Sequence, residues 1–329
     1  MAWTKTYTGE APLRINKWLA LEGVCSRREA DALIEQGMIQ IDGQKVTRQG
    51  EKIETGQTLT LTQKATRRLD NQFSLIFHKP EGVVSGTPEE GEIPAVRLIT
   101  GESLSGKSHA IPGRYNKLAP LGRLDKDSRG LLILSEDGVL AKAVIGPESQ
   151  LEKEYIVKVK GEVTDEMLAK LRHGLELDGR KLKPAIVEKI KAHELRFILK
   201  EGRNRQIRRM CQLVDLRVAD LLRTRIGPLE LAGLPEGKWR PISGRERDAL
   251  LKAETPSPRK TRPDRVRPDR AGSPPRAGGQ VAKAKRPASG KDIRRDKTQP
   301  ALPDRTPSPY KGEKFKRTRL GPRKRSPIK

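Results

Sequence analysis

Apolar and polar residues follow helix and strand spacings along the first sixty positions, and this pattern predicts a small mixed domain. Residues 13–23 (LRINKWLALEG) have the spacing of a short amphipathic helix. Ser26 begins S-R-R-E, a capping-box pattern that opens a second helix with an apolar stripe. Alternation around Asp42-Gly43 predicts a hairpin, and residues 50–61 add a further strand. We expect these helices and strands to form one compact module.

The chain from residue 72 to 250 shows short strands with only occasional helices. The clearest strands are the apolar run at residues 131–134 and the alternating segment 153–160, in which Tyr155 shares a face with two valines. Residues 203–215 (RNRQIRRMCQLVD) predict a helix with arginines on one side and apolar residues on the other. Because strands and helices do not alternate regularly, the pattern predicts an α+β fold with a largely antiparallel mixed sheet and flanking helices.

Hydropathy and composition together divide the chain into two domains and a tail. The domains are predicted at residues 1–65 and 72–250, with a linker at residues 63–71. Residues 251–329 hold 13 of the 24 prolines, 25 basic and 7 acidic residues, and almost no large apolar side chains. Such a segment cannot bury enough surface to offset its ordering entropy, so we expect it to be disordered. It either solubilises the protein or binds phosphate, and we favour the second interpretation.

The overall charge indicates a polyanionic partner. Lys and Arg number 68 against 42 Asp and Glu, which gives a formal net charge of +26. An anionic membrane surface would also fit this charge, but no apolar run approaches the ~18 residues of a membrane span. The start of the chain also lacks the apolar region of a signal peptide. Nucleic acid is therefore the favoured partner.

Cysteine and histidine usage excludes two kinds of site. Cys25 and Cys211 cannot form a disulfide framework, which fits a reducing cytoplasm, and we interpret both as buried rather than reactive. The four histidines lack ligand spacing with each other or with cysteine, so we expect no metal.

The segment GRLDKDSRG at residues 122–130 is dense in Arg and Asp and lies directly before the apolar strand. A loop held by a rigid strand positions functional groups well. Asp125 and Asp127 are therefore candidates for a catalytic carboxylate. The alternative is that both aspartates only form a turn, as Asp often does.

Several separated motifs occur in an order that identifies a family. They are RINKWLALEGVCSRREADALIEQG, HKPEGVVS, GRLDKDSRGLLILSEDG, EKEYIV, and EGRNRQIRRMC with LLRTRIGPLEL. With these motifs the chain resembles the RNA pseudouridine synthases, and within them the ribosomal branch typified by RsuA and RluF. The first motif is similar to the alpha-L RNA-binding domain. The chain departs from the family at His78, where Asn is usual.

The resemblance implies that Asp125 is the catalytic nucleophile. The family breaks the N-glycosidic bond of a uridine in RNA, turns the uracil and rejoins it through carbon five, so no cofactor is expected. The sequence does not choose between attack on the sugar and attack on the base. An ionised carboxylate near an apolar strand needs a cation beside it. Arg208 matches the family's partner arginine, and Arg203 is the second choice, although a phosphate contact is the favoured interpretation of Arg203.

The resemblance also implies that the target nucleotide leaves its stack and that other residues replace the lost contacts. Arg123 would fill the vacated space or contact phosphate. Tyr155 would stack on the uracil and assist proton removal from carbon five, and Leu221 would line the base pocket; core packing is the alternative for both. Asp127 and Ser128 are interpreted as shaping the loop. The remaining candidate RNA-binding residues form an N-terminal basic face that is otherwise only a solvated surface: Arg14, Lys17, Arg27 and Arg28.

We therefore expect an isomerase that converts a specific uridine of ribosomal RNA, in the large-subunit 23S rRNA, to pseudouridine. The expected protein is a cytoplasmic monomer that acts on free rRNA or on pre-ribosomal particles. The alternatives are a synthase acting on tRNA or small-subunit rRNA, and a non-catalytic RNA-binding or ribosome-assembly factor. A catalytic carboxylate would only repel phosphate in a binding protein, so the intact motif favours the enzyme.

Overall fold

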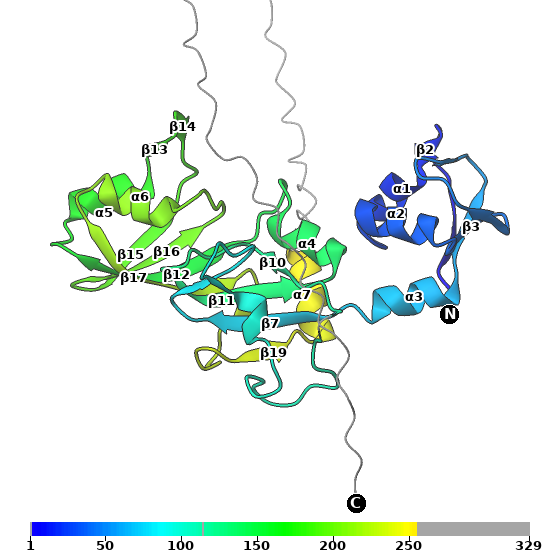
Figure 1. The fold of residues 1–329 in the computed structure, drawn as a ribbon. Coiled ribbons are helices and arrows are strands. Elements are labelled where there is room, and N and C mark those ends of the chain that lie inside the picture. Colours follow the sequence, from blue (N-terminus) through cyan, green and yellow to red (C-terminus); the bar gives the residue numbers. More distant parts are fainter. Residues whose placement is uncertain (1, 114, 255–329) are drawn as a thin grey trace, which may run out of the picture. The chain divides into compact units, whose positions relative to one another are not determined.

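The computed structural model describes residues 2–113 and 115–254 (Figure 1). The N-terminal part contains two helices and short strands around its own hydrophobic cluster. Its elements are β1 (Thr4–Thr6), β2 (Leu13–Arg14), α1 (Ile15–Leu21), α2 (Arg27–Glu35), β3 (Ile39–Ile41), β4 (Gln44–Val46), β5 (Lys52–Ile53) and β6 (Thr58–Leu61). Strands β1, β6, β3 and β4 form an antiparallel sheet in that order.

Local sequence signals account for this module. The Ser26 hydroxyl accepts a hydrogen bond from the backbone N–H of Glu29, and the Glu29 carboxylate accepts one from the N–H of Ser26, which confirms the capping box. Asp42 and Gly43 both have positive φ, 48° and 81°, as a two-residue type I′ hairpin turn requires. Burial raises the pKa of Cys25 to about 12, so this thiol stays protonated at neutral pH. Cys25 is therefore a buried core residue rather than a reactive thiol.

The predicted linker is a helix. Helix α3 (Gln63–Asp70) begins after Thr62, whose hydroxyl accepts a hydrogen bond from the N–H of Ala65. Ala65 is buried in the N-terminal cluster and Leu69 packs against it, one helical turn later. This i, i+4 pair anchors a segment that contains neither glycine nor proline, so the residues predicted as a linker are helical.

The second part is built on a nine-stranded sheet. Its elements are β7 (Ser74–Lys79), β8 (Val83–Val84), β9 (Ile93–Pro94), a 3₁₀ helix (Ala95–Leu98), β10 (Ala119–Leu121), β11 (Arg129–Ser135), α4 (Gly138–Ile145), β12 (Lys153–Lys160), α5 (Asp165–Arg172), β13 (Glu176–Leu177), β14 (Arg180–Lys181), β15 (Ile186–Lys191), β16 (Glu194–Leu199), α6 (Gln206–Gln212), β17 (Arg217–Ile226), β18 (Leu229–Glu230), β19 (Trp239–Pro241) and α7 (Gly244–Glu254). The main strand order is β15-β16-β12-β17-β11-β7-β19. Every pair in this sheet is antiparallel except β11–β17, which confirms the predicted α+β fold and its largely antiparallel mixed sheet.

The central strands are buried on both faces. Leu132 and Leu134 of β11 belong to one hydrophobic cluster, whereas Leu131 and Ile133 belong to another. Helices α5 and α6 contribute to the first cluster, and α4 and α7 contribute to the second (Figure 1). This double burial explains why β11 reads as a continuous apolar run rather than as an alternation.

Two boundaries differ from the predictions. Helix α6 begins at Gln206, and Arg205 before it has a left-handed backbone, so residues 203–205 lie outside the helix. Helix α7 continues to Glu254, so the predicted boundary at residue 250 falls within a helix. The disordered tail was predicted over residues 251–329, but residues 251–254 belong to α7. The rest of the predicted tail, residues 255–329, lies outside the described residues. Within the described part, no helix is both long and apolar enough to cross a membrane.

Candidate active site

A cleft of about 760 Å³ opens beside the loop at residues 122–128. Strand β12, strand β17 and the segment at residues 199–208 form its other walls. Six of the predicted site residues line it: Arg123, Asp125, Tyr155, Arg203, Arg208 and Leu221. The remaining four, Arg14, Lys17, Arg27 and Arg28, are exposed residues of the N-terminal module and do not line the cleft.

Backbone contacts hold the loop at residues 122–128 in one conformation. The Ser85 hydroxyl donates to the carbonyl of Leu124 at 2.7 Å and accepts from its N–H at 2.9 Å, while the Leu124 side chain is buried in the core. The N–H of Gly82 donates to the carbonyl of Lys126 at 2.8 Å. The loop is thus fixed through an apolar anchor next to Asp125, whose side chain is 34% exposed and borders the cleft.

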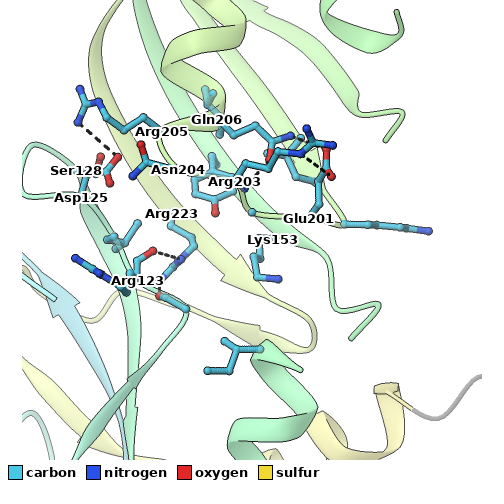
Figure 2. A pocket seen from close by; sticks show the side chains of 18 of the residues that line it. Arg123, Asp125, Ser128, Lys153, Glu201, Arg203, Asn204, Arg205, Gln206 and Arg223 are labelled. Carbon is cyan, nitrogen blue, oxygen red and sulfur yellow. Dashed lines mark hydrogen bonds and ion pairs between the residues drawn. The ribbon is translucent and has the colours of Figure 1, made fainter. Parts of the chain in front are cut away.

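The cation beside Asp125 is Arg205, rather than Arg208 or Arg203. Its Nη1 lies 3.6 Å from Oδ2 of Asp125, and its two terminal nitrogens donate to the two oxygens of Asp127 at 3.1 and 2.8 Å. Partial burial raises the pKa of Asp127, but the hydrogen bond from Arg205 and the charges of Arg208 and Arg205 outweigh it, and the pKa is lowered overall. Figure 2 shows Arg205 reaching toward the loop that carries Asp125.

Arg208 holds the end of the loop instead of contacting Asp125. Its Nη2 donates to the backbone carbonyl of Asp127 and, at 3.3 Å, to the Ser128 hydroxyl. Its side chain is only 14% exposed, and its ion pair is with Asp127 at 3.3 Å. Arg208 and Asp127 therefore shape the loop together, in line with the loop-shaping interpretation of Asp127 and Ser128.

Arg203 holds a hairpin rather than presenting free donors to phosphate. Its guanidinium donates to the carbonyls of Leu177, Arg180 and Lys181 at 2.8–3.1 Å, which fixes β13 and β14. Its Nε lies 3.5 Å from Glu201. Figure 2 shows the two side chains next to each other. These donors have backbone acceptors, and the phosphate contact favoured for Arg203 stays a prediction.

Comparison with known proteins identifies the family. The RNA pseudouridylate synthase family model matches residues 72–213, and the S4 domain model matches residues 13–59. The dual-specificity RNA pseudouridine synthase RluF of Salmonella typhi is 34% identical over 262 residues, covering 79% of this chain and 86% of the relative. The chain belongs to the RNA pseudouridine synthase family.

Two further matches support the same assignment. The ribosomal large subunit pseudouridine synthase B of Bacillus subtilis is 32% identical over 239 residues, covering 71% of this chain and 93% of the relative. A crystal structure of a pseudouridylate synthase matches with a TM-score of 0.50 at 26% identity and covers 72% of this chain and 99% of that one. The synthase is thus an isomerase of uridine in RNA, as the motifs implied, and RNA is its partner.

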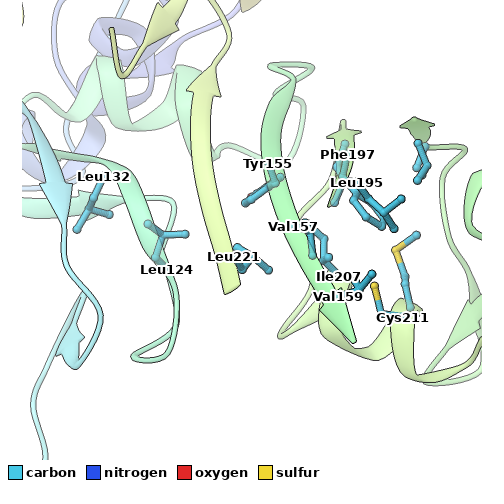
Figure 3. Packing of buried hydrophobic residues seen from close by; sticks show 14 of the residues in the cluster. Leu124, Leu132, Tyr155, Val157, Val159, Leu195, Phe197, Ile207, Cys211 and Leu221 are labelled. Atoms are coloured by element: carbon cyan, nitrogen blue, oxygen red, sulfur yellow. The ribbon is translucent and has the colours of Figure 1, made fainter. Parts of the chain in front are cut away.

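Tyr155 and Leu221 form the apolar floor of the synthase cleft. They lie on adjacent strands, where Val157 of β12 pairs with Leu221 of β17. Both side chains belong to the main hydrophobic cluster (Figure 3). Both also line the cleft. The two alternatives predicted for each residue, core packing and a pocket wall, are therefore compatible.

Sequence reasoning missed Arg205, Lys79 and Arg223. Arg223 is 1% exposed, and its guanidinium donates to the carbonyls of Leu131 at 2.7 Å and Gly122 at 2.8 Å. Lys79 is fully buried and donates to the carbonyls of Pro80 and Val83, and burial above all lowers its pKa to about 8. The period-two pattern of β17 places Arg223 in phase with the buried Leu221, and this signal could have revealed it. No comparable signal marks Arg205.

Proposed function

We propose that this synthase converts a uridine of large-subunit ribosomal RNA to pseudouridine, with Asp125 as the nucleophile. The names of the relatives support the reaction, and the name of the Bacillus subtilis relative supports the large ribosomal subunit. The observation that carries the residue assignment is the Asp125 carboxylate at the cleft wall with Arg205 beside it. The guanidinium places a positive charge beside the carboxylate that attacks.

The residues around Asp125 have separate roles in the proposed reaction. An extruded uridine enters the cleft, where Tyr155 and Leu221 offer the uracil an apolar surface. Asp125 attacks the sugar or the base, and the bond between N1 and the sugar breaks. Carbon five then bonds to the sugar, the bond to Asp125 breaks and restores the carboxylate, and N1 gains a proton as carbon five loses one. Tyr155 assists removal of the proton from carbon five. Arg123, exposed at the rim of the cleft, fills the gap that the uridine leaves in the RNA.

The reaction conserves atoms and electrons, so the proposed mechanism uses no cofactor. The exposed Arg14, Lys17, Arg27 and Arg28 of the S4 domain are proposed to contact RNA phosphates, since such contacts tolerate any sequence. We further propose that the protein acts as a monomer in the cytoplasm, on free rRNA or on an assembling particle.

Asp125→Asn tests the assignment. We expect pseudouridine formation at the target to slow by at least about a thousandfold, because the amide cannot act as the nucleophile. RNA affinity should stay close to that of the wild type. Chemical mapping of pseudouridine in ribosomal and transfer RNA, from cells with each version of the gene, measures the first effect and identifies the target. Filter binding measures the second effect.

Asp165→Asn is the matched control, because Asp165 lies in the first turn of α5 and does not line the cleft. This variant should keep the wild-type rate. Conversion by Asp125→Asn at a near wild-type rate would show that the nucleophile is another residue. A target found in tRNA or in small-subunit rRNA would overturn the proposed substrate but not the mechanism.

A further inference from the structure

The cleft contains a lysine that no carboxylate neutralises within the described residues. Lys153, at the start of β12, is partly buried and lines the same cleft as Asp125. Among the described residues its Nζ makes one hydrogen bond, to the carbonyl of Leu151 at 3.3 Å. Tyr155 lies two residues further along the strand, so both side chains face the cleft. An ammonium group in this position has lost much of its hydration without gaining a counter-charge.

Other cations lie around Lys153. Desolvation by burial lowers the pKa of Lys153, and the positive charges of Arg223 and Lys183 lower it further. Lys153, Lys183 and Arg223 all line the cleft, and we call these three residues the cation row. Arg223 is buried, and its hydrogen-bond partners among the described residues are all backbone carbonyls.

The carboxylates that line the cleft already have partners. Asp125 pairs with Arg205. Glu201 accepts hydrogen bonds from the Gln206 amide and from the backbone N–H of Lys183, and it lies 3.5 Å from Arg203 (Figure 2). Among the described residues neither carboxylate forms an ion pair with Lys153, Lys183 or Arg223, so the cation row leaves an excess of positive charge in the cleft. Such a site, partly shielded from water, favours an anion more strongly than exposed lysines do.

We propose that Lys153 binds a phosphodiester group of the substrate RNA next to the extruded uridine, with Lys183 at the rim and Arg223 behind it. This inference rests on the proposed function, since it assigns a contact within the same substrate site. A phosphodiester oxygen accepts from Nζ and replaces the hydration that the lysine has lost. The contact anchors the strand on the far side of the base from Arg123. It thereby holds the uridine out of its helix while Asp125 reacts.

Lys153→Gln tests the contact with a fragment of the ribosomal RNA that contains the mapped uridine. We expect the Kd to rise roughly tenfold at moderate salt, since a charge-assisted hydrogen bond is lost. The slope of log Kd against log salt concentration should fall by about 0.7 to 0.9, the value for one phosphate contact. Lys153→Arg keeps the charge and should keep the slope. Lys160→Gln, an exposed lysine of the same strand on the opposite face, should match the wild type.

A neutral-linkage scan locates the phosphate. Single methylphosphonate linkages are placed one at a time around the uridine in the same fragment. At one position the neutral linkage should weaken binding of the wild type but not of Lys153→Gln, because the two changes remove the same contact. Equal slopes for the wild type and Lys153→Gln, or equal losses at every linkage, would overturn the proposal. A failure of the proposed function gives a different result, namely no pseudouridine in the fragment with any version of the protein.

Discussion

Arg205 combines a strained backbone with contacts to two carboxylates. Its φ of 48° and ψ of 33° lie in the left-handed region, which costs an L-residue about 1–2 kcal/mol. Its side chain is 44% exposed, and exposed ion pairs contribute about 0–1 kcal/mol. The ion pairs therefore stabilise the folded state by no more than the backbone strain destabilises it. Strain of this kind is often found at functional sites, and here it directs the guanidinium toward Asp125.

Arg205→Gly separates the two effects. Glycine adopts the left-handed conformation without strain, so the free energy of unfolding should stay within about 1 kcal/mol of the wild type. The rate of pseudouridine formation should fall at least about tenfold, because Asp125 loses its cation. Arg205→Val should lose the same activity and a further 1–2 kcal/mol or so of stability. Urea denaturation and single-turnover assays measure both, and a fully active Arg205→Gly would remove Arg205 from the mechanism.

The one parallel pair of the main sheet depends on a glycine. Gly130 of β11 pairs with Arg223 of β17 and has a φ of 113°. A Cβ atom added at Gly130 would lie 2.3 Å from the carbonyl oxygen of Arg223 and 2.6 Å from its nitrogen. These are backbone atoms, so neither can move without shifting a strand. The close approach brings β17, with Leu221 and Arg223, against the strand that follows the Asp125 loop.

Gly130→Ala should therefore destabilise the protein strongly. Gly174, with a φ of 97° and nothing within 4 Å of its added Cβ, is the matched control for backbone strain alone. We expect Gly174→Ala to cost about 1 kcal/mol and Gly130→Ala at least about 2 kcal/mol more. The midpoints of urea denaturation measure the difference. Equal losses for the two variants would mean that the strands separate easily at this point.

At the scale of the molecule, positive charge is distributed unevenly along the chain. The first 250 residues hold 43 basic and 35 acidic residues, whereas residues 251–329 carry a net charge of +18.

Leu250 is fully buried and Leu251 packs against the cluster that contains α4, so the last turns of α7 belong to the catalytic domain. A truncation that tests the tail must therefore begin after Glu254.

Removing residues 255–329 should weaken RNA binding at low salt and flatten its salt dependence. The basic tail would neutralise phosphates and release counterions, and each lost contact reduces the slope of log Kd against log salt by about 0.7 to 0.9. A salt titration of RNA binding by the full chain and the truncated chain measures the effect. Unchanged affinity and slope would leave the tail without a role in binding.

Much of the fold could be predicted because its signals are local. The capping box at Ser26, the turn at Asp42-Gly43 and the alternation around Tyr155 each depend on residues within a few positions of one another. The loop that carries Asp125 was recognised because a charged motif directly precedes an apolar strand. Helix α3 was missed because two apolar residues in a basic segment give only a weak pattern.

The sequence by itself determined the domain types, the strands and the position of the candidate nucleophile, since these follow from spacing and motif order. Only the tertiary structure decided which arginine meets which acid. Asp125 and Arg205 are 80 positions apart, and three neighbouring arginines, Arg203, Arg205 and Arg208, carry the same charge in one motif. A left-handed backbone at Arg205 and the carbonyls around Arg203 send these side chains in different directions. Charge alone cannot distinguish them, because electrostatic pairing depends on distance in space rather than on position in the chain.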